Sequence, residues 1–202
     1  MDINGLIIRS VDYGDKDKIV TIAAPDGIYT AKAKGVRTAK SKLKGYVGVL
    51  NFGEFSLAEG KGGYTLSGAD VTESFYSCWT DADKYAAAMI CLEIYEKCSR
   101  QGAPSDLIEL LKVLKNINYG EFYPFAEALR YGVITAAESG VDVTEKVFPD
   151  KICGIFSSLL KCDSADEVLT EYTREDVKLF LKHLYRGFYS ELGVKITVAS
   201  QL

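Results

Sequence analysis

The first 77 residues of the chain consist of short apolar, β-branched runs separated by clusters of turn-forming residues, a pattern typical of β-strands. The expected strands are residues 3–11, 18–24, 28–34, 46–59 and 64–76. Pro25-Asp26-Gly27 suits a tight reversal, and the glycines of residues 60–63 indicate a hairpin between the last two runs. Five strands in about 75 residues predict a small OB-fold barrel, a five-stranded Greek-key design.

From Thr80 onward the apolar positions recur at helical spacing. Thr80 is the candidate N-cap of a helix that continues to about Arg100, and Thr173 is the candidate N-cap of the last helix. The expected helices between them are residues 105–118, 124–140 and one or two short helices within 147–171. The order predicts an α+β protein, with a barrel domain at residues 1–77 and an all-helical domain at residues 78–202.

Composition excludes several classes of protein. The chain has 202 residues, 48% of them hydrophobic and 26% charged, which is close to the average of soluble globular proteins. No apolar run approaches the roughly 18 residues of a membrane span, and the N-terminal stretch is too short for a secretory signal. Five cysteines, an odd number without a C-x-x-C pair, favour free thiols. We therefore expect a cytoplasmic protein without membrane contact.

Positive charge is concentrated in one stretch although the net charge is −4. No acidic residue lies between Asp26 and Glu54. The basic segment, residues 32–44, carries Lys32, Lys34, Arg37, Lys40, Lys42 and Lys44. Local potential governs what binds at such a stretch, so an anionic ligand is one interpretation and a solvated loop is the other.

Catalytic motifs are missing from the sequence. His183 is the single histidine and lies within the last helix, which excludes metal sites built from several imidazoles. The glycines around Lys61 have the wrong spacing for a phosphate-binding loop, and Gly62 stands where that motif needs Ser or Thr. We therefore expect no enzyme, no catalytic residues and no cofactor.

The basic segment has the residue types that follow a phosphate backbone. Its cations can neutralise phosphates, Gly35 permits close backbone approach, and the Thr38 and Ser41 hydroxyls can bond phosphate oxygens. Nearby aromatic residues can fill the barrel or stack on unpaired bases. They are Tyr13, Tyr29, Tyr46, Phe52, Phe55 and Tyr64. The combination predicts that single-stranded nucleic acid binds without base-specific readout.

A second basic feature lies on the last expected helix. Its members are spaced i, i+4 and are Arg174, Lys178, Lys182 and Arg186, which we call the α-stripe. The α-stripe is a secondary DNA contact, a site for an acidic partner peptide, or a solvated face balanced by Glu171, Glu175 and Asp176.

Several blocks in fixed order resemble the bacterial recombination mediator RecO family. They are residues 5–21, Ala33-Lys34-Gly35-Val36-Arg37, Lys42-Leu43-Lys44-Gly45 and Glu73-Ser74-Phe75-Tyr76, with Thr173-Arg174-Glu175-Asp176 later in the chain. The resemblance implies an OB-fold domain on a helical body. It also implies a non-catalytic protein that binds single- and double-stranded DNA, anneals complementary strands and works with RecR to load the recombinase.

The same resemblance implies roles for particular residues. In that family basic barrel residues contact DNA, here the six cations of the basic segment, and the protein is cytoplasmic and nucleoid-associated. The acidic tail of single-strand DNA-binding protein docks on the helical body, for which Lys178, Lys182 and Arg186 are the expected equivalents.

This chain departs from the family at a zinc module. Many members carry a four-cysteine module, whereas residues 141–162 hold only Cys153 and Cys162, so we expect no metal. The chain is shorter than most members and its ending, residues 195–200, is less basic. An alternative function is a protein adaptor of the repair machinery that docks acidic peptides, with DNA contact secondary.

Overall fold

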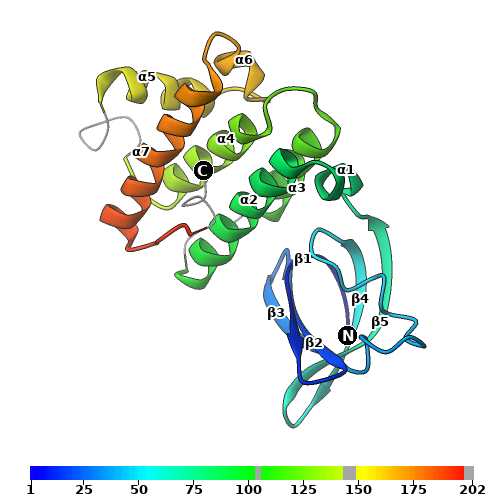
Figure 1. The fold of residues 1–202 in the computed structure, drawn as a ribbon. Helices are drawn as coiled ribbons and strands as arrows, with labels where there is room; N and C mark the ends of the chain where they lie inside the picture. The colour runs from blue at the N-terminus through cyan, green and yellow to red at the C-terminus, as the bar shows by residue number, and fades with distance from the viewer. Residues whose placement is uncertain (103–105, 143–148, 198–202) are drawn as a thin grey trace. The chain divides into compact units, whose positions relative to one another are not determined.

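The chain forms two compact units in a computed structural model that describes residues 1–102, 106–142 and 149–197 (Figure 1). The barrel unit is Met1–Phe75 and the helical unit is Tyr76–Leu202. A β-barrel followed by helices confirms the predicted α+β class.

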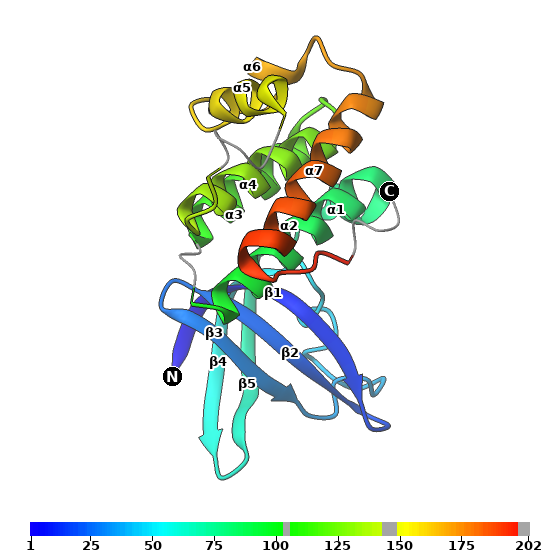
Figure 2. The ribbon, with the colours of Figure 1, turned by 90° about the vertical axis from the view of Figure 1, so that its left-hand side faces the viewer.

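The barrel unit consists of five strands. They are β1 (Asp2–Tyr13), β2 (Asp17–Ala24), β3 (Gly27–Ala33), β4 (Phe52–Gly60) and β5 (Gly63–Glu73). The strands close in the order β1-β2-β3-β5-β4, with β1 paired to both β2 and β4 (Figure 2). Only the β3–β5 pair is parallel among these strands, and the closed five-stranded arrangement confirms the expected OB-type barrel.

Alternation along the strands determines which residues fill the barrel. Ala31 and Ala33 of β3 are buried, whereas Thr30, the residue before Ala31, is exposed. This alternation is the period-2 pattern of a strand with one buried face. Phe55 of β4 is fully buried in the same core. Gly53 is required by close packing, because a Cβ there would lie 2.1 Å from the carbonyl oxygen of Asp70.

Residues 46–51 form turns rather than the beginning of a strand, so that part of the prediction was wrong. Leu50 adopts a left-handed φ of 69°, which interrupts any extended run. Its side chain is fully buried, and its backbone N–H donates to the Ile7 carbonyl oxygen. Burial and this hydrogen bond offset the roughly 1–2 kcal/mol that a left-handed backbone costs a residue with a Cβ.

The helical unit contains seven helices within its described residues. They are α1 (Tyr76–Thr80), α2 (Ala82–Arg100), α3 (Leu107–Tyr119), α4 (Pro124–Glu138), α5 (Asp150–Leu159), α6 (Asp166–Leu169) and α7 (Arg174–Leu192). Helix α4 packs against α2, α3 and α7 (Figures 1 and 2). Gly132 allows the approach of α7, because a Cβ there would lie 2.6 Å from Leu184 Cδ2. No helix among the described residues is long and apolar enough to span a membrane.

The helix starts confirm one predicted cap and correct another. Thr173 caps α7, and its hydroxyl and the Asp176 carboxylate form a reciprocal capping box. Asp81, not Thr80, caps α2, because its carboxylate accepts a hydrogen bond from the Lys84 N–H. Thr80 instead ends α1, where its hydroxyl donates to the Ser77 carbonyl oxygen.

Candidate nucleic-acid interface

Lys32 lies in β3, and the rest of the basic segment belongs to a long connection between β3 and β4 that apolar residues fasten to the barrel. Val36, Val47 and Leu50 are buried in the barrel unit, and Leu43 is partly buried against the same core. The Arg37 N–H also donates to the Lys16 carbonyl oxygen at 2.9 Å. The cations between these anchors therefore belong to a positioned loop.

Consecutive turns shape the first half of this loop. Gly35 has a φ of +63°, a conformation that costs glycine little. Its carbonyl oxygen accepts hydrogen bonds from the Thr38 N–H at 3.1 Å and from the Thr38 hydroxyl at 2.7 Å. The next turn is closed by the Ser41 N–H, which donates to the Thr38 carbonyl oxygen. The Thr38 hydroxyl keeps its acceptor capacity for a ligand.

Four cations of the basic segment form what we call the lysine set. Its members are Lys34, Lys40, Lys42 and Lys44, and all four side chains are exposed. In the part of the chain that the structure describes, none of them forms a salt bridge. An exposed lysine without a carboxylate partner can neutralise a phosphate without first breaking a contact.

Lys32 is partly neutralised by a neighbouring carboxylate. Its Nζ lies 2.8 Å from Asp17 Oδ2 and 4.7 Å from the centroid of the Tyr13 ring. Asp17 also accepts a hydrogen bond from the Gly35 N–H at 2.7 Å. The Gly35 bond first, and the Lys32 bond second, hold the pKa of Asp17 below its ordinary value. The bond to Asp17 in turn raises the pKa of Lys32.

Arg37 is paired in the same way with the preceding hairpin. Its Nη2 lies 3.1 Å from Asp12 Oδ2, and its Nη1 donates to the Gly14 carbonyl oxygen at 3.0 Å. Asp12 is shared with Lys18, whose Nζ lies 3.5 Å away. Asp12 and Asp17 thus act on two of the six predicted site residues, although both lie outside the acid-free stretch.

Sequence reasoning missed these two aspartates, but the signal was present. Antiparallel pairing places Lys18 of β2 opposite Ala33 of β3. The start of β2 therefore lies beside the end of β3, and Asp17 comes next to Lys32 and Gly35. A meander of short antiparallel strands always brings such ends together.

The aromatic residues divide between core and surface. Phe55 is fully buried, and Tyr29 and Tyr64 contact each other edge to face with ring centroids 5.8 Å apart. Tyr13 and Tyr46 are 53% and 40% exposed, so their rings are accessible for stacking on bases.

The α-stripe lies on α7, in the helical unit, and its members differ in their contacts. Arg174 lies over the Tyr123 ring at 4.9 Å, and its Nη1 is 3.9 Å from Asp83 Oδ2. Lys178 is half-buried, whereas Lys182 and Arg186 are exposed. Within the described ranges, only Arg174 of the four forms a salt bridge.

The cysteines do not form a metal site in the described part of the chain. Cys153 is buried, Cys162 is half-buried, and none of the five cysteines forms a disulfide among the described residues. Across residues 1–102, 106–142 and 149–197, no group of three or more His, Cys, Asp and Glu side chains could hold a metal ion.

Comparison with known proteins identifies relatives of the barrel unit. Residues 1–75 match the family model described as Recombination protein O N terminal. The DNA repair protein RecO of Acetivibrio thermocellus is 33% identical over 117 residues, which cover 57% of this chain and 46% of that protein. RecO of Desulfitobacterium hafniense is 33% identical over 102 residues, covering 50% and 37%.

A further relative extends the same pattern. RecO of Dehalococcoides mccartyi is 32% identical over 118 residues, covering 57% of this chain and 47% of that protein. The match thus spans less than half of the length of each of these relatives. The predicted resemblance to the RecO family is confirmed.

Proposed function

We propose that this chain, whose barrel unit belongs to the RecO N-terminal family, is a non-catalytic DNA-binding protein of recombinational repair. The barrel unit binds the phosphates of single-stranded DNA through the lysine set, and Lys32 and Arg37 join the contact where Asp17 and Asp12 release them. Double-stranded DNA is a second substrate for the same cations, because phosphate contacts do not depend on base identity.

The lysine set is the observation that carries this proposal. Four exposed lysines without salt bridges in the described residues lie on a loop held by buried Val36 and Val47. Each phosphate neutralised on a single strand contributes about −0.7 to the slope of log affinity against log salt. Four contacts predict a slope of about −3, and six predict about −4.

Fluorescence anisotropy with a dye-labelled oligo-dT strand tests the proposal. The test variant replaces Lys40, Lys42 and Lys44 by Gln, and we expect its affinity at 50 mM salt to fall by more than about tenfold. The control variant removes the same charge at exposed lysines elsewhere, namely Lys61, Lys115 and Lys161. Equal affinities of the two variants would contradict the proposal.

Annealing of complementary strands is the activity we propose for the bound state. Cations that neutralise phosphates on two strands lower the repulsion between the strands. Bases that stack on the exposed rings of Tyr13 and Tyr46 are kept unstacked from their neighbours and available for pairing. A stopped-flow assay with complementary labelled oligonucleotides, naked and then coated with single-strand DNA-binding protein, measures it. No acceleration by the wild-type chain would reduce the function to passive binding.

RecR and the acidic tail of single-strand DNA-binding protein are the partners we propose, with recombinase loading as the outcome. The exposed Lys182 and Arg186 and the half-buried Lys178 support the tail contact, because they present positive charge along one face of α7. Charge reversal of Lys178 and Lys182 to Glu is expected to abolish binding of an acidic tail peptide and to spare oligo-dT binding. Unchanged peptide affinity would remove the α-stripe from this role.

A further inference from the structure

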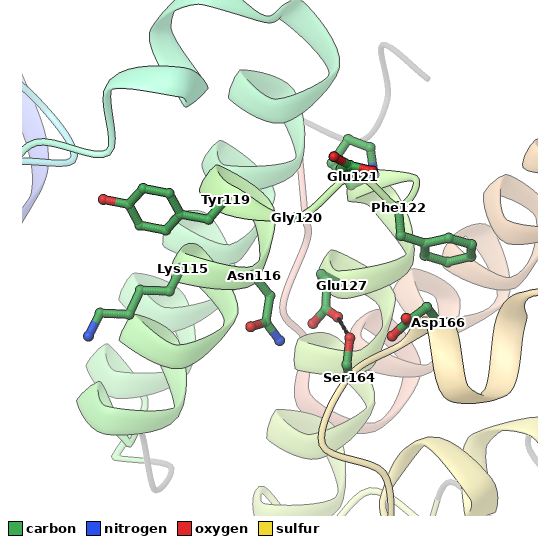
Figure 3. Close-up of a pocket in the computed structure, with 10 residues that line it drawn as sticks. Lys115, Asn116, Tyr119, Gly120, Glu121, Phe122, Glu127, Ser164 and Asp166 are labelled. Atoms are coloured by element: carbon green, nitrogen blue, oxygen red, sulfur yellow. Dashed lines mark hydrogen bonds between the residues drawn. The ribbon is translucent and has the colours of Figure 1, made fainter.

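A cavity of about 480 Å³ lies in the helical unit (Figure 3). It lies between the end of α3, the start of α4 and the start of α6. Its lining includes Asn116, Phe122, Pro124, Glu127, Ser164 and Asp166. We call it the Glu127 pocket.

Glu127 is the most unusual residue of this pocket, because it is an acidic side chain only 5% exposed. Its Oε1 accepts hydrogen bonds from the Ser164 hydroxyl and from the Ala165 N–H, both at 2.8 Å. Its Oε2 is buried and has no hydrogen-bond partner among the described residues. Buried carboxylate oxygens rarely lack a hydrogen-bond partner, and each exception calls for an explanation.

The nearest buried cation does not supply that partner. Arg130 is 3% exposed, and its Nη1 donates to Glu109 Oε1 at 2.7 Å. Its Nε donates to the Cys162 carbonyl oxygen at 3.1 Å. Arg130 therefore attracts Glu127 only through space, and its hydrogen-bonded partner is Glu109.

The rest of the lining also favours a cation. Asp166 and Glu121 add exposed carboxylates to the lining. Lys115 and Tyr119 belong to the lining, but their side chains extend away from Glu127 in Figure 3. Asn116 and Ser164 extend toward Glu127 in the same view. Three carboxylates and one lysine belong to the lining, so a positively charged group that enters the pocket meets more negative than positive charge.

Two observations narrow the class of cation. The described residues hold no group of three or more His, Cys, Asp and Glu side chains that could hold a metal ion, which disfavours a divalent metal. The half-buried Phe122 lines the same pocket, and its ring extends away from Glu127 in Figure 3. A guanidinium is planar, weakly hydrated and able to stack on an aromatic ring while donating to several oxygens.

We propose that the Glu127 pocket binds a guanidinium group, which donates to Glu127 Oε2. The group belongs to an arginine side chain of a partner protein or to a free organic cation of the same chemistry. The site involves none of the residues proposed to bind DNA, so this proposal survives or fails separately from the proposed function.

The test is a titration of the full chain with N-acetyl-arginine-N-methylamide, monitored by NMR at the Ser164 and Ala165 amides. We expect saturable shifts with a dissociation constant on the order of 1 mM. Glu127→Gln keeps Oε1 as the acceptor for Ser164 and Ala165 but removes the charge at Oε2. We expect this variant to bind the arginine probe at least about tenfold more weakly than the wild-type chain. Glu191→Gln removes an exposed charge on α7 and serves as the matched control.

Three probes complete the experiment. The citrulline analogue is neutral and nearly isosteric, and saturable binding equal to that of the arginine probe would overturn the proposal. Tighter binding of the lysine analogue would overturn the preference for guanidinium. The ethylguanidinium ion distinguishes the sources: weaker binding than the arginine probe indicates a partner's side chain, and equal binding indicates a free cation.

A second variant keeps the test decisive should Glu127→Gln fail to fold. Asp166→Asn changes an exposed carboxylate of the lining, and we expect about threefold weaker binding of the arginine probe. Unchanged affinity for the arginine probe in every variant that folds would contradict the proposal.

Discussion

Two aspartates of the β1–β2 hairpin compete with DNA for two cations of the basic segment. Asp12 holds Arg37 at 3.1 Å, and Asp17 holds Lys32 at 2.8 Å. Replacing both aspartates by Asn removes the competing charges while an amide oxygen remains to accept the Gly35 N–H. We expect this double variant to bind single-stranded DNA more tightly than the wild-type chain.

The size of the gain follows from the number of cations released. The wild-type slope of log affinity against log salt is about −3 when only the lysine set meets phosphates, and two more contacts bring it to about −4. The same change raises the affinity at 50 mM salt by about tenfold or more. Solvent screens exposed ion pairs, so the loss of these two pairs leaves the barrel folded.

The assay is anisotropy of a dye-labelled oligo-dT strand between 50 and 300 mM salt. Asp15→Asn is the matched control, because Asp15 is exposed in the same hairpin and forms no salt bridge within the described residues. Its slope is expected to equal that of the wild-type chain. A double variant with the wild-type slope, or with weaker binding, would refute the idea that these pairs restrain the site.

The same pair predicts a pH dependence of stability. The pKa of Asp17 is lowered in the folded chain, so its contribution is complete above the ordinary aspartate value of 3.8 and is lost as the pH falls through the lower folded value. The pKa of Lys32 is raised, so its contribution is complete below 10.5 and is lost at higher pH. The midpoint temperature of thermal unfolding, followed by circular dichroism, should therefore decrease less steeply with falling pH for Asp17→Asn than for the wild-type chain. An equal decrease in both would contradict this.

Three further predictions concern the scaffold. Gly53→Ala should destabilise the barrel by about 1–3 kcal/mol or more, because its Cβ meets the Asp70 carbonyl oxygen, whereas Gly62→Ala meets nothing within 4 Å; urea denaturation compares them. Thr173→Ala should cost about 1 kcal/mol and Thr173→Ser much less, since only Ser keeps the cap of α7; equal losses would argue against the capping box. Burial raises the pKa of Cys98 to about 11, so iodoacetamide at pH 8 should label half-buried Cys162 first, and peptide mapping that finds equal labelling would contradict this.

The fold was largely predictable because its local signals agree with one another. Alternation in β3, the turn at Pro25–Gly27 and the capping box at Thr173 are each readable within a few residues. The errors occurred where longer-range contacts override local preference. Leu50 takes a left-handed backbone where its side chain is buried and its N–H bonds the Ile7 carbonyl oxygen, and Thr80 loses the cap of α2 because it belongs to the end of α1.

The candidate site was predictable only in part. The distribution of charged residues along the sequence identifies the basic segment. Val36 and Val47 are buried and fasten the loop to the barrel, and the lysines between them remain exposed. The pairing of Lys32 with Asp17 depends on strand register, which the charge pattern does not contain. The lining of the Glu127 pocket comes from two stretches distant in the sequence, residues 115–127 and 164–166, so no local motif predicts it.

The central claim is that the exposed lysines of the basic segment bind the phosphates of single-stranded DNA. The most direct measurement is the salt dependence of oligo-dT affinity for the wild-type chain and for the variant with Gln at Lys34, Lys40, Lys42 and Lys44. We expect a slope of log affinity against log salt of about −3 for the wild-type chain, and a slope that is smaller in magnitude by almost three for the variant. A wild-type slope near zero, or an identical slope in the variant, would contradict it.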